Sequence, residues 1–444
     1  MSADLKPKVL MVSTEYPPIP GGVGRYTSNL VKALKEIGVE VYVLCNEKGN
    51  GDFFGLDPLN ENNSQVILDV INTLRPDIVH IQLEHGLYGF KQVFKKNSNK
   101  SITNIEEFYE KCPIPIVTTF HSAYPFKQWL KISKLLYHQQ NDIIDTDSIN
   151  PLDKIKEYWI ALSTYFAFNK SNRIKMKKSS ANIVFSEYLA HLISDGNNSV
   201  NTRRSDLEKN KLFVIYHGAE PVVSVSAEKN LARRKFNLPI DRKIGVLFGF
   251  ATNTKGWDIL NSLNIPHNWT IVINQSKNLY GSGKPTSIGI LDSPDHKDTN
   301  NKDQKIINLN QGFLTDSDLS TLLYSCDIVI LPYTVTSGSG VLFDALAHGL
   351  PFISSNLGFF KEFEEKGLGI TVKRKSGEFE RALEKLEANY SDYVQKVKEF
   401  KPELKWTNIA SQHLEIYIKS ISERKKVQAD DNFFYLIFPI SNHD

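Results

Sequence analysis

The sequence predicts an α/β protein of two domains, each built around a doubly wound parallel sheet. Three observations lead to this fold class. The chain has 444 residues, whereas a single hydrophobic core rarely grows beyond about 250–300 residues. Apolar runs typical of buried parallel strands alternate with helical segments in two separate series. The two series meet at residues 217–243, where charge runs and two prolines interrupt the pattern, so we place the domain boundary there.

The first series opens with a βαβ unit. The apolar run Lys8–Thr14 predicts a strand, Gly21–Gly24 a loop, Arg25–Ile37 a helix with one apolar face, and Val39–Leu44 a second strand. The alternation continues with a helix over 64–74 and with strands over 77–81, 114–120, 178–185 and 211–216. The stretch 123–178 is too long for a plain connection, and we interpret it as an insertion with helical character.

The second series repeats this design. Strands are predicted over 244–249, 269–274, 327–331 and 351–354, and helices over 257–263, 318–325, 341–348, 378–390 and 408–418. The polar segment 276–305 is rich in Gly and Asp and predicts a mobile loop. These patterns predict an amino-terminal domain over 1–217, a carboxyl-terminal domain over 218–420, and a tail over 421–444 that packs back on the domain junction.

Composition excludes several classes of protein. Hydrophobic residues make up 41% and charged residues 23% of the chain, which argues against global disorder and against a disulfide scaffold. A net charge of +3 lacks the large positive excess that is typical of nucleic-acid-binding proteins. Cys45, Cys112 and Cys326 match no metal spacing and indicate thiols in a reducing compartment. No targeting segment and no run of roughly 20 apolar residues is found, so we expect a soluble, cytoplasmic protein that is at most peripheral on a membrane.

The loop Gly21-Gly22-Val23-Gly24 is the first candidate ligand site. Glycines let backbone approach a ligand, and a helix N-terminus favours an anion. The spacing resembles the start of a dinucleotide fingerprint, but Thr27 stands at its third glycine position and three prolines lengthen the turn. We therefore reject a dinucleotide site, and a turn that binds no ligand remains the alternative.

Further candidates follow predicted strands, at the edge where doubly wound sheets bind ligands. Lys255 offers a cation for phosphate, and the loop Ser337–Gly340 offers backbone N–H groups at a helix start. Asp344 lies one turn into that helix and suits a ligand hydroxyl. His121 follows the strand that ends at Phe120. The plain alternatives are a surface lysine, a solvent-facing aspartate and a structural histidine.

Two Asp-x-Asp triplets invite a metal interpretation. Asp316 and Asp318 follow Thr315 in a helix-start pattern, so these acids serve the helix end. Asp145 and Asp147 lie in a polar loop. We therefore predict no tightly bound metal.

Several motifs in a fixed order resemble the family 4 retaining glycosyltransferases of the GT-B fold. The loop Tyr16-Pro-Pro-Ile-Pro-Gly-Gly-Val-Gly-Arg25 matches the opening loop of that family closely. Further matching segments lie at 76–80, 84–86, 119–121, 248–256, 311–313, 331–333, 339–340 and 344–351. The resemblance covers nearly the whole chain apart from the stretches 123–178 and 276–305.

The resemblance implies two facing Rossmann-like domains with a cleft between them, a nucleotide-diphosphate sugar as donor, and no metal or cofactor. Its catalytic positions fall on His121, which would reach a donor-sugar hydroxyl, on Lys255, which would hold the diphosphate, and on Asp344, which would bind the ribose. Its donor-binding positions fall on Gly21, Gly22, Gly24, Gly312, Phe313, Ser337, Gly338, Ser339 and Gly340. Glu84, His85 and His217 are expected on the acceptor side, where a sugar or a lipid-linked sugar would bind.

Three departures from the family pattern bear on activity. Thr336 stands where the family has an acid, Phe250 stands where it often has an arginine, and no glycine motif follows Asn274. The main hypothesis is retaining transfer of a hexose in glycan, polysaccharide or glycolipid synthesis. The alternatives are a nucleotide-sugar-binding protein that has lost its chemistry and a nucleotide-sugar hydrolase or epimerase.

The segment 158–178 is aromatic in its first half and cationic in its second. Such a segment suits an anionic membrane surface, whereas we favour a buried helix followed by a solvated one. The apolar run Phe433–Phe438 near the end of the chain is expected to dock across the domain junction.

Overall fold

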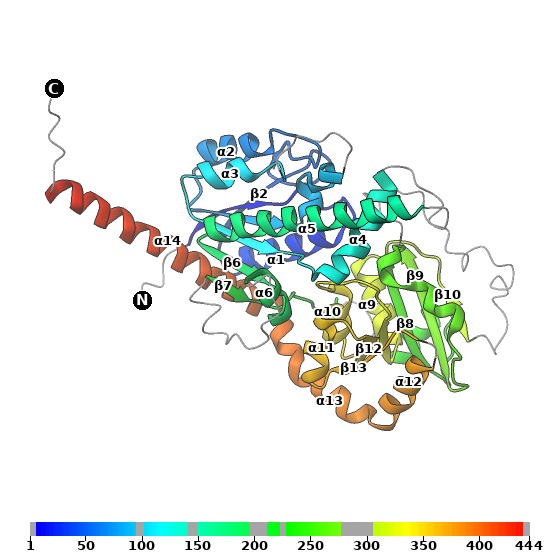
Figure 1. The fold of residues 1–444 in the computed structure, drawn as a ribbon. Coiled ribbons are helices and arrows are strands. Elements are labelled where there is room, and N and C mark those ends of the chain that lie inside the picture. Colours follow the sequence, from blue (N-terminus) through cyan, green and yellow to red (C-terminus); the bar gives the residue numbers. More distant parts are fainter. Residues whose placement is uncertain are drawn as a thin grey trace.

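Two α/β domains lie against each other in the structure, a computed structural model that describes residues 6–94, 102–140, 150–194, 211–222, 228–276, 305–375 and 377–437 (Figure 1). The predicted loop 276–305 falls almost wholly outside these residues, as does the triplet Asp145–Asp147. Within the described part of the chain, no helix is long and apolar enough to cross a membrane.

Seven parallel strands form the first sheet, in the order β3-β2-β1-β4-β5-β6-β7. The strands are β1 (Lys8–Val12), β2 (Glu40–Cys45), β3 (Phe53–Phe54), β4 (Ile78–Leu83), β5 (Ile116–Phe120), β6 (Ala181–Val184) and β7 (Leu212–Val214). Their helices are α1 (Gly22–Glu36), α2 (Asn63–Leu74), α3 (Glu106–Lys111), α4 (Phe126–Gln140), α5 (Pro151–Lys178) and α6 (Glu187–Ser194). The strand order reverses between β1 and β4, which is where a doubly wound sheet forms a ligand crevice.

Six parallel strands form the second sheet, in the order β10-β9-β8-β11-β12-β13. The strands are β8 (Lys243–Phe250), β9 (Trp269–Ser276), β10 (Ile306–Asn308), β11 (Ile328–Leu331), β12 (Phe352–Ser355) and β13 (Gly369–Val372). Their helices are α8 (Lys229–Lys235), α9 (Asp316–Ser325), α10 (Gly340–Ala347), α11 (Gly358–Glu365), α12 (Glu378–Ala388) and α13 (Tyr390–Phe400). Both sheets therefore have the doubly wound design that the sequence predicts.

The predicted helix over 257–263 is present as a 3₁₀ helix. The chain forms two short 3₁₀ helices there, Asn253–Lys255 and Trp257–Ser262, separated by Gly256 with a φ of +71°. A side chain at Gly256 would lie 2.0 Å from the carbonyl oxygen of Pro332, so only glycine fits. This left-handed residue separates the two short helices, and such short segments commonly close as 3₁₀ turns.

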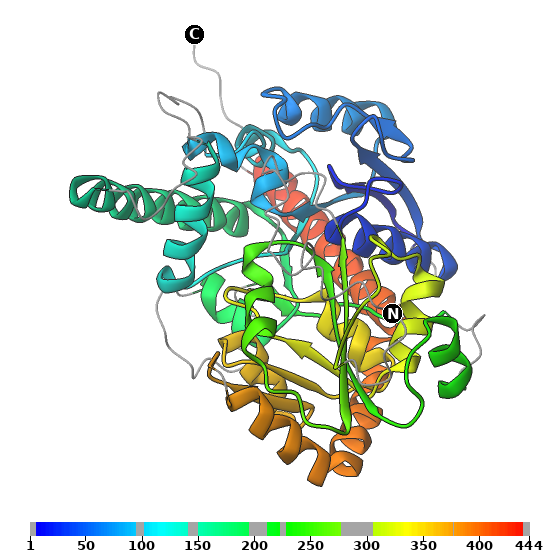
Figure 2. The same ribbon diagram turned by 90° about the vertical axis from the view of Figure 1, so that its right-hand side faces the viewer.

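The last helix returns to the first domain. Helix α14 (Trp406–Ile437) contains the predicted helix 408–418 and packs against α1, and both views show it running from the second domain along the first (Figures 1 and 2). Tyr417 of α14 is fully buried in the same apolar cluster as Val9 of β1 and Phe343 of α10. One core therefore joins both domains, although the predicted domain limits stay a prediction. Phe433–Phe438 lies beyond the residues whose side chains are described.

The stretch 123–178 consists mainly of helices α4 and α5, which pack on each other. In Figure 2 the long helix α5 projects outward from the body of the first domain. From α4, the Gln128 side chain reaches the second domain, where its Oε1 accepts a hydrogen bond from the backbone N–H of Thr336 (2.9 Å). The insertion is thus part of the contact between the domains.

A second polar contact between the domains joins α6 to α11. The backbone N–H of Tyr188 donates to Oε2 of Glu362 (2.9 Å). Burial raises the pKa of Glu362 to about 7, although the backbone hydrogen bonds and Lys366 act in the opposite direction. This carboxyl group therefore titrates near neutrality inside the domain interface.

Candidate active site

A cleft of about 930 Å³ opens between the two domains. It is bounded by the start of α1 and the ends of β4 and β5 on one side, and by the loops after β8 and β11 on the other. The structure brings these predicted site residues together on its walls: Gly21, Gly22, Glu84, His121, His217, Lys255, Phe313, Ser337, Gly338, Ser339, Gly340 and Asp344. Gly24, Gly312 and His85 do not line it.

The glycine loop forms the first turn of α1 and holds a buried acid beneath it. Glu15 is 6% exposed, and its Oε1 accepts the backbone N–H of Gly24 (2.8 Å). A side chain at Gly21 would lie within 1.8–2.1 Å of the Glu15 carboxyl group. Burial and the neighbouring Glu84 raise the pKa of Glu15, although its hydrogen bonds to backbone N–H groups act in the opposite direction. The Glu15 carboxyl group thus already lies at the positive N-terminal end of α1. The glycine loop can therefore let a ligand come close to the backbone, but it contributes little positive charge.

His121 stands at the carboxyl end of β5 and faces the cleft. Its Nε2 lies 2.9 Å from Oε1 of Gln82, and an amide oxygen can only accept, so Nε2 carries the proton. Burial and the adjacent His217 lower the pKa of His121 to about 3. His121 is therefore a neutral imidazole whose Nδ1 can accept a hydrogen bond.

Lys255 lies beside the start of α10. Its Nζ is 2.7 Å from the hydroxyl oxygen of Tyr333 and 3.9 Å from the centre of that ring. The same hydroxyl is 3.3 Å from Oγ of Ser339, which caps α10 by accepting from the N–H of Leu342. A cation and a helix N-terminus thus lie side by side, an arrangement that suits a phosphate.

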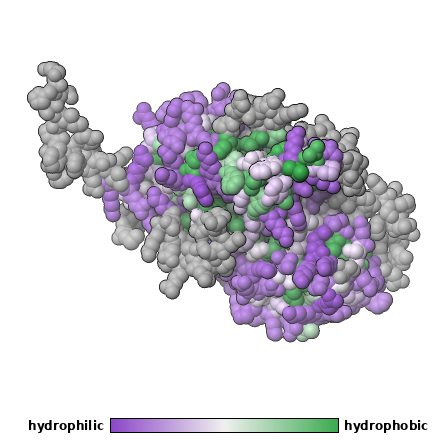
Figure 3. Space-filling model, in the orientation of Figure 1, coloured by the Kyte–Doolittle hydropathy of each residue, from purple (hydrophilic) through white to green (hydrophobic). Residues whose placement is uncertain are grey.

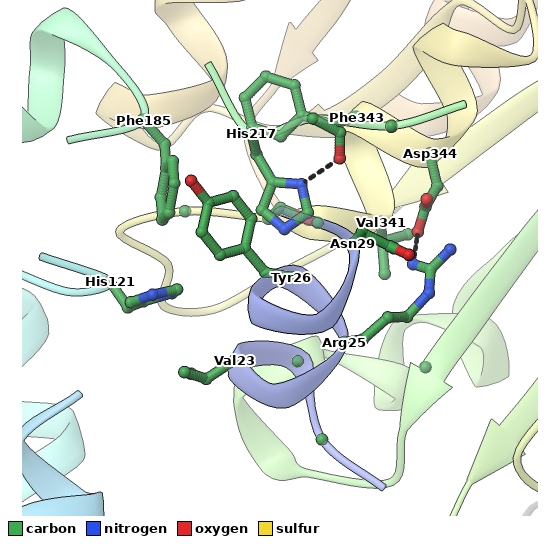
Figure 4. Close-up of a pocket in the computed structure, with 18 of the residues that line it drawn as sticks. Val23, Arg25, Tyr26, Asn29, His121, Phe185, His217, Val341, Phe343 and Asp344 are labelled. Atoms are coloured by element: carbon green, nitrogen blue, oxygen red, sulfur yellow. Dashed lines mark hydrogen bonds and ion pairs between the residues drawn. The ribbon is translucent and has the colours of Figure 1, made fainter. Parts of the chain in front are cut away.

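Asp344 is buried on α10 and pairs with an arginine of the opposite domain (Figure 4). Nη1 of Arg25 donates to Oδ2 of Asp344 (2.7 Å), and Nε donates to Oδ1 of Asp316 (2.9 Å). These two aspartates hold the pKa of Arg25 well above its usual value. Arg25 therefore links α1 to both α10 and α9 across the cleft.

His217 lies where the chain passes from one domain to the other. Its Nδ1 donates to the carbonyl oxygen of Gly218 (2.9 Å), and its ring stacks on Phe343 with 5.7 Å between the ring centres. Figure 4 shows it beside Tyr26, and the centres of the two rings are 4.9 Å apart. Burial lowers the pKa of His217 to about 4, so its Nε2 presents a lone pair.

Phe313 forms an aromatic wall in the second domain. It is 52% exposed and stacks on Phe250, with 6.3 Å between ring centres. The backbone of Gly312 is fixed because its carbonyl oxygen accepts from Nδ2 of Asn274 (2.8 Å). Phe250, which stands where the resemblance leads us to expect an arginine, therefore supplies an apolar surface here.

His85 lies behind the cleft wall. It is 2% exposed, and its ring centre is 4.3 Å from that of Phe168. Burial and the nearby Lys175 lower its pKa well below the usual value. Its surroundings are those of a core side chain, because aromatic rings from η2 (Phe90–Phe94) and α5 enclose it.

Five side chains at or behind the cleft were not predicted as site residues: Glu15, Arg25, Gln82, Gln128 and Tyr333. Arg25 and Tyr333 occur within quoted motifs, but their partners Asp344 and Lys255 are 319 and 78 residues away. No local pattern reports such pairings. Within the described residues, no group of three or more His, Cys, Asp and Glu side chains could hold a metal ion.

Comparisons with known proteins agree with this architecture. The family model Glycosyltransferase Family 4 matches residues 20–196, and Glycosyl transferases group 1 matches residues 291–389. No curated protein matches the sequence.

Solved structures similar to this chain include three sugar-related proteins. Sucrose-phosphate synthase from Thermosynechococcus elongatus is 15% identical, with a TM-score of 0.60 over 94% of this chain and 100% of its own. The catalytic domain of starch synthase IV from Arabidopsis thaliana, bound to ADP and acarbose, is 14% identical, with a TM-score of 0.57 over 94% and 100%. HepE from Anabaena, in complex with UDP and glucose, is 14% identical, with a TM-score of 0.55 over 92% and 98%. These likenesses confirm the fold as two facing Rossmann-like domains.

Proposed function

We propose that this chain, which has the GT-B fold and glycosyltransferase-family regions in both halves, transfers a hexose from a nucleotide-diphosphate sugar to an acceptor hydroxyl with retention of configuration. The observation that carries the proposal is the meeting of Lys255, the start of α10 and Asp344 on one wall of the cleft, opposite His121. Similar structures were solved with UDP and glucose and with ADP and acarbose. A donor of that kind would fit a wall with a cation, helix amides and an exposed phenyl ring.

In the proposed complex each part of the donor meets matching chemistry. The diphosphate lies against Lys255 and the N-terminus of α10, where negative charge is favoured. The ribose hydroxyls donate to Asp344, and the base lies beside Gly312 and Phe313. The donor sugar reaches across the cleft, where Nδ1 of His121 accepts from one of its hydroxyls.

The proposed reaction breaks the bond between the anomeric carbon and the diphosphate oxygen and forms a bond to the acceptor oxygen on the same face. Negative charge grows on the leaving oxygen, and Lys255 and the α10 amides stabilise it. The acceptor proton passes to the leaving phosphate, so no protein base is required. His121 stays neutral and positions the sugar. We propose that the reaction is independent of metal, because these groups supply the positive charge.

A thermal-shift screen of nucleotides and nucleotide sugars tests the proposal. One class of nucleotide diphosphate should raise the melting temperature by mass action, and its sugar derivative should also yield product with an acceptor panel. Nucleotide binding without turnover on any acceptor would favour a protein that has lost its chemistry. Loss of donor without acceptor would favour a hydrolase or epimerase, and the absence of any nucleotide-induced shift would contradict the proposal.

We further propose that the acceptor is lipid-linked and that the chain works at the cytoplasmic face of a membrane, held by α5. One ridge of α5, with residues three or four apart, consists of Leu152, Ile155, Trp159, Leu162, Phe166, Lys170, Arg173 and Lys177. Four of its apolar side chains are strongly exposed, at 77% for Leu152, 56% for Ile155, 63% for Trp159 and 64% for Phe166. The interpretation of this half of the segment as a buried helix is therefore wrong.

The charge of the α5 ridge suits an anionic lipid surface. The ridge is apolar for four turns and cationic for the next three, and Lys170, Arg173 and Lys177 are exposed. Helix α5 carries seven Lys and Arg residues but only two acids, of which Glu157 is buried beside His138. Figure 3 shows apolar residues gathered on the surface over α5. Apolar side chains beside cations are typical of helices that lie in a membrane interface.

Replacing Trp159 and Phe166 with serine is expected to lower partitioning onto vesicles of phosphatidylcholine and phosphatidylglycerol by about a hundredfold or more, since each side chain loses roughly 1.5–3 kcal/mol of apolar burial. Flotation measures this. The matched control replaces Leu59 and Ile240, which are 69% and 59% exposed elsewhere on the molecule. Equal flotation of both double variants, or equal binding of the unaltered chain to pure phosphatidylcholine, would contradict this proposal.

A further inference from the structure

A chain of buried polar side chains connects the cleft to the carboxyl-terminal helix. Nε2 of His121 lies 2.9 Å from Oε1 of Gln82, Nε2 of Gln82 lies 3.3 Å from Nε2 of His80, and Nδ1 of His80 lies 2.6 Å from the hydroxyl of Tyr417. We name these four side chains the relay. Gln82, His80 and Tyr417 are fully buried, and they belong to β4 and α14.

One protonation pattern turns every contact of the relay into a hydrogen bond, with the second N–H of Gln82 directed at Sδ of Met11 (3.2 Å). The Gln82 amide nitrogen only donates, so Nε2 of His80 accepts and its Nδ1 carries a proton toward Tyr417. The hydroxyl of Thr119, 2.7 Å away, then also donates to Nε2 of His80. The orientation that this gives Gln82 directs its oxygen at His121. His121 consequently holds its proton on Nε2 and its lone pair on Nδ1.

Burying these polar side chains costs free energy unless each of them forms hydrogen bonds. On the same strand, the neighbours of Gln82 and His80 are fully buried apolar side chains, among them Val79, Ile81 and Leu83. An apolar pair at 80 and 82 would fill the core without a polar network. The polar pair instead fixes the imidazole ring of His121, the one relay member that lines the cleft.

We infer that Gln82 is a positioning residue for His121: held by His80 and Tyr417, it fixes the imidazole so that Nδ1 accepts a hydroxyl of the donor sugar. This inference rests on the proposed function only in assigning the hydroxyl to a donor sugar. The position of the proton on the His121 ring does not depend on that function. It also gives α14 a role at the cleft, because Tyr417 reaches the relay from 337 residues away in sequence.

The first test observes the ring without substrate. Nitrogen-15 NMR of the histidine side chains of the full chain, with His121 assigned by its loss in His121→Ala, should show neutral His121 protonated on Nε2. Gln82→Leu should convert this signal into a mixture of the two tautomers. A wild-type His121 protonated on Nδ1, or an unchanged signal in Gln82→Leu, would overturn the inference.

The second test is kinetic. Gln82→Leu should lower kcat/KM about tenfold, the effect of losing one positioned hydrogen bond, and should cause no further loss in a His121→Ala background. Tyr417→Phe should lower kcat/KM less. The matched control Tyr109→Phe removes an equally buried hydroxyl that bonds Thr118 of β5 at 2.8 Å, outside the relay, and should leave kcat/KM unchanged. Independent, additive losses from Gln82→Leu and His121→Ala would overturn the positioning role, whereas failure to find any turnover would count against the proposed function and leave the NMR result decisive.

Discussion

Replacing Lys255 with alanine is expected to lower kcat about 10²–10³-fold, the usual cost of removing one charge-stabilising group from an active site. Lys255 is the cation that lies beside both Tyr333 and the start of α10. The charge that it stabilises exists fully only when the diphosphate leaves, so the loss should fall mainly on kcat. Steady-state kinetics with the best donor from the thermal-shift screen measures it.

Two further variants sharpen this test. Lys255→Arg keeps the charge with a different shape and should retain part of the activity. Lys361→Ala removes an exposed lysine of the same domain on α11, outside the cleft, and should behave as wild type. Equal turnover by Lys255→Ala and Lys361→Ala would remove Lys255 from the mechanism.

Replacing Arg25 with alanine is expected to lower the free energy of unfolding by roughly 1–3 kcal/mol. A broken buried ion pair costs more than this, but the Arg25 side chain is 31% exposed, so solvent screens part of the effect. The loss arises because Asp344, with a side chain only 7% exposed, keeps its charge without its partner. Denaturant unfolding followed by tryptophan fluorescence measures it.

The partner variant identifies the cause. Adding Asp344→Asn to Arg25→Ala should restore part of the lost stability, because the uncompensated buried charge disappears. Lys35→Ala on the same helix is exposed and should change stability by only a few tenths of a kcal/mol. Strictly additive losses from the two changes at Arg25 and Asp344 would show that their contact contributes nothing.

Much of the fold could be predicted because it depends on local patterns. The strands β1, β2, β4 and β5 are rich in apolar residues and buried along almost their whole length, and such segments are visible without knowledge of their partners. The strands β3, β10 and β13 were not predicted: they are short, and unlike the equally short β6, β11 and β12 they are not fully buried along their length. The break at Gly256, before the helix at 257–262, could not be predicted, because a distant carbonyl group, that of Pro332, excludes any side chain there.

The same distinction between local patterns and long-range contacts separates the site residues that could be predicted from those that could not. Lys255, His121 and the loop Ser337–Gly340 could be selected because they follow buried strands whose carboxyl ends share one edge of a sheet. Arg25 could not, since its two partners belong to helices of the other domain. Glu15 was missed because nothing in the sequence shows that a side chain would fill the space beneath Gly21. Long-range pairing, rather than residue type, decides these roles.

Burial of Glu362 at the domain interface makes the docking of the two domains depend on pH, although the hydrogen bond from Tyr188 acts to lower its pKa. An ordinary solvated glutamate has a pKa of 4.5, whereas Glu362 within the contact has a pKa of about 7. Between these two values the docked carboxyl group keeps a proton that the separated one would release, so docking is increasingly disfavoured as pH rises through this window and changes no further above it. Mild acidity therefore stabilises the joined domains relative to neutral or alkaline solution.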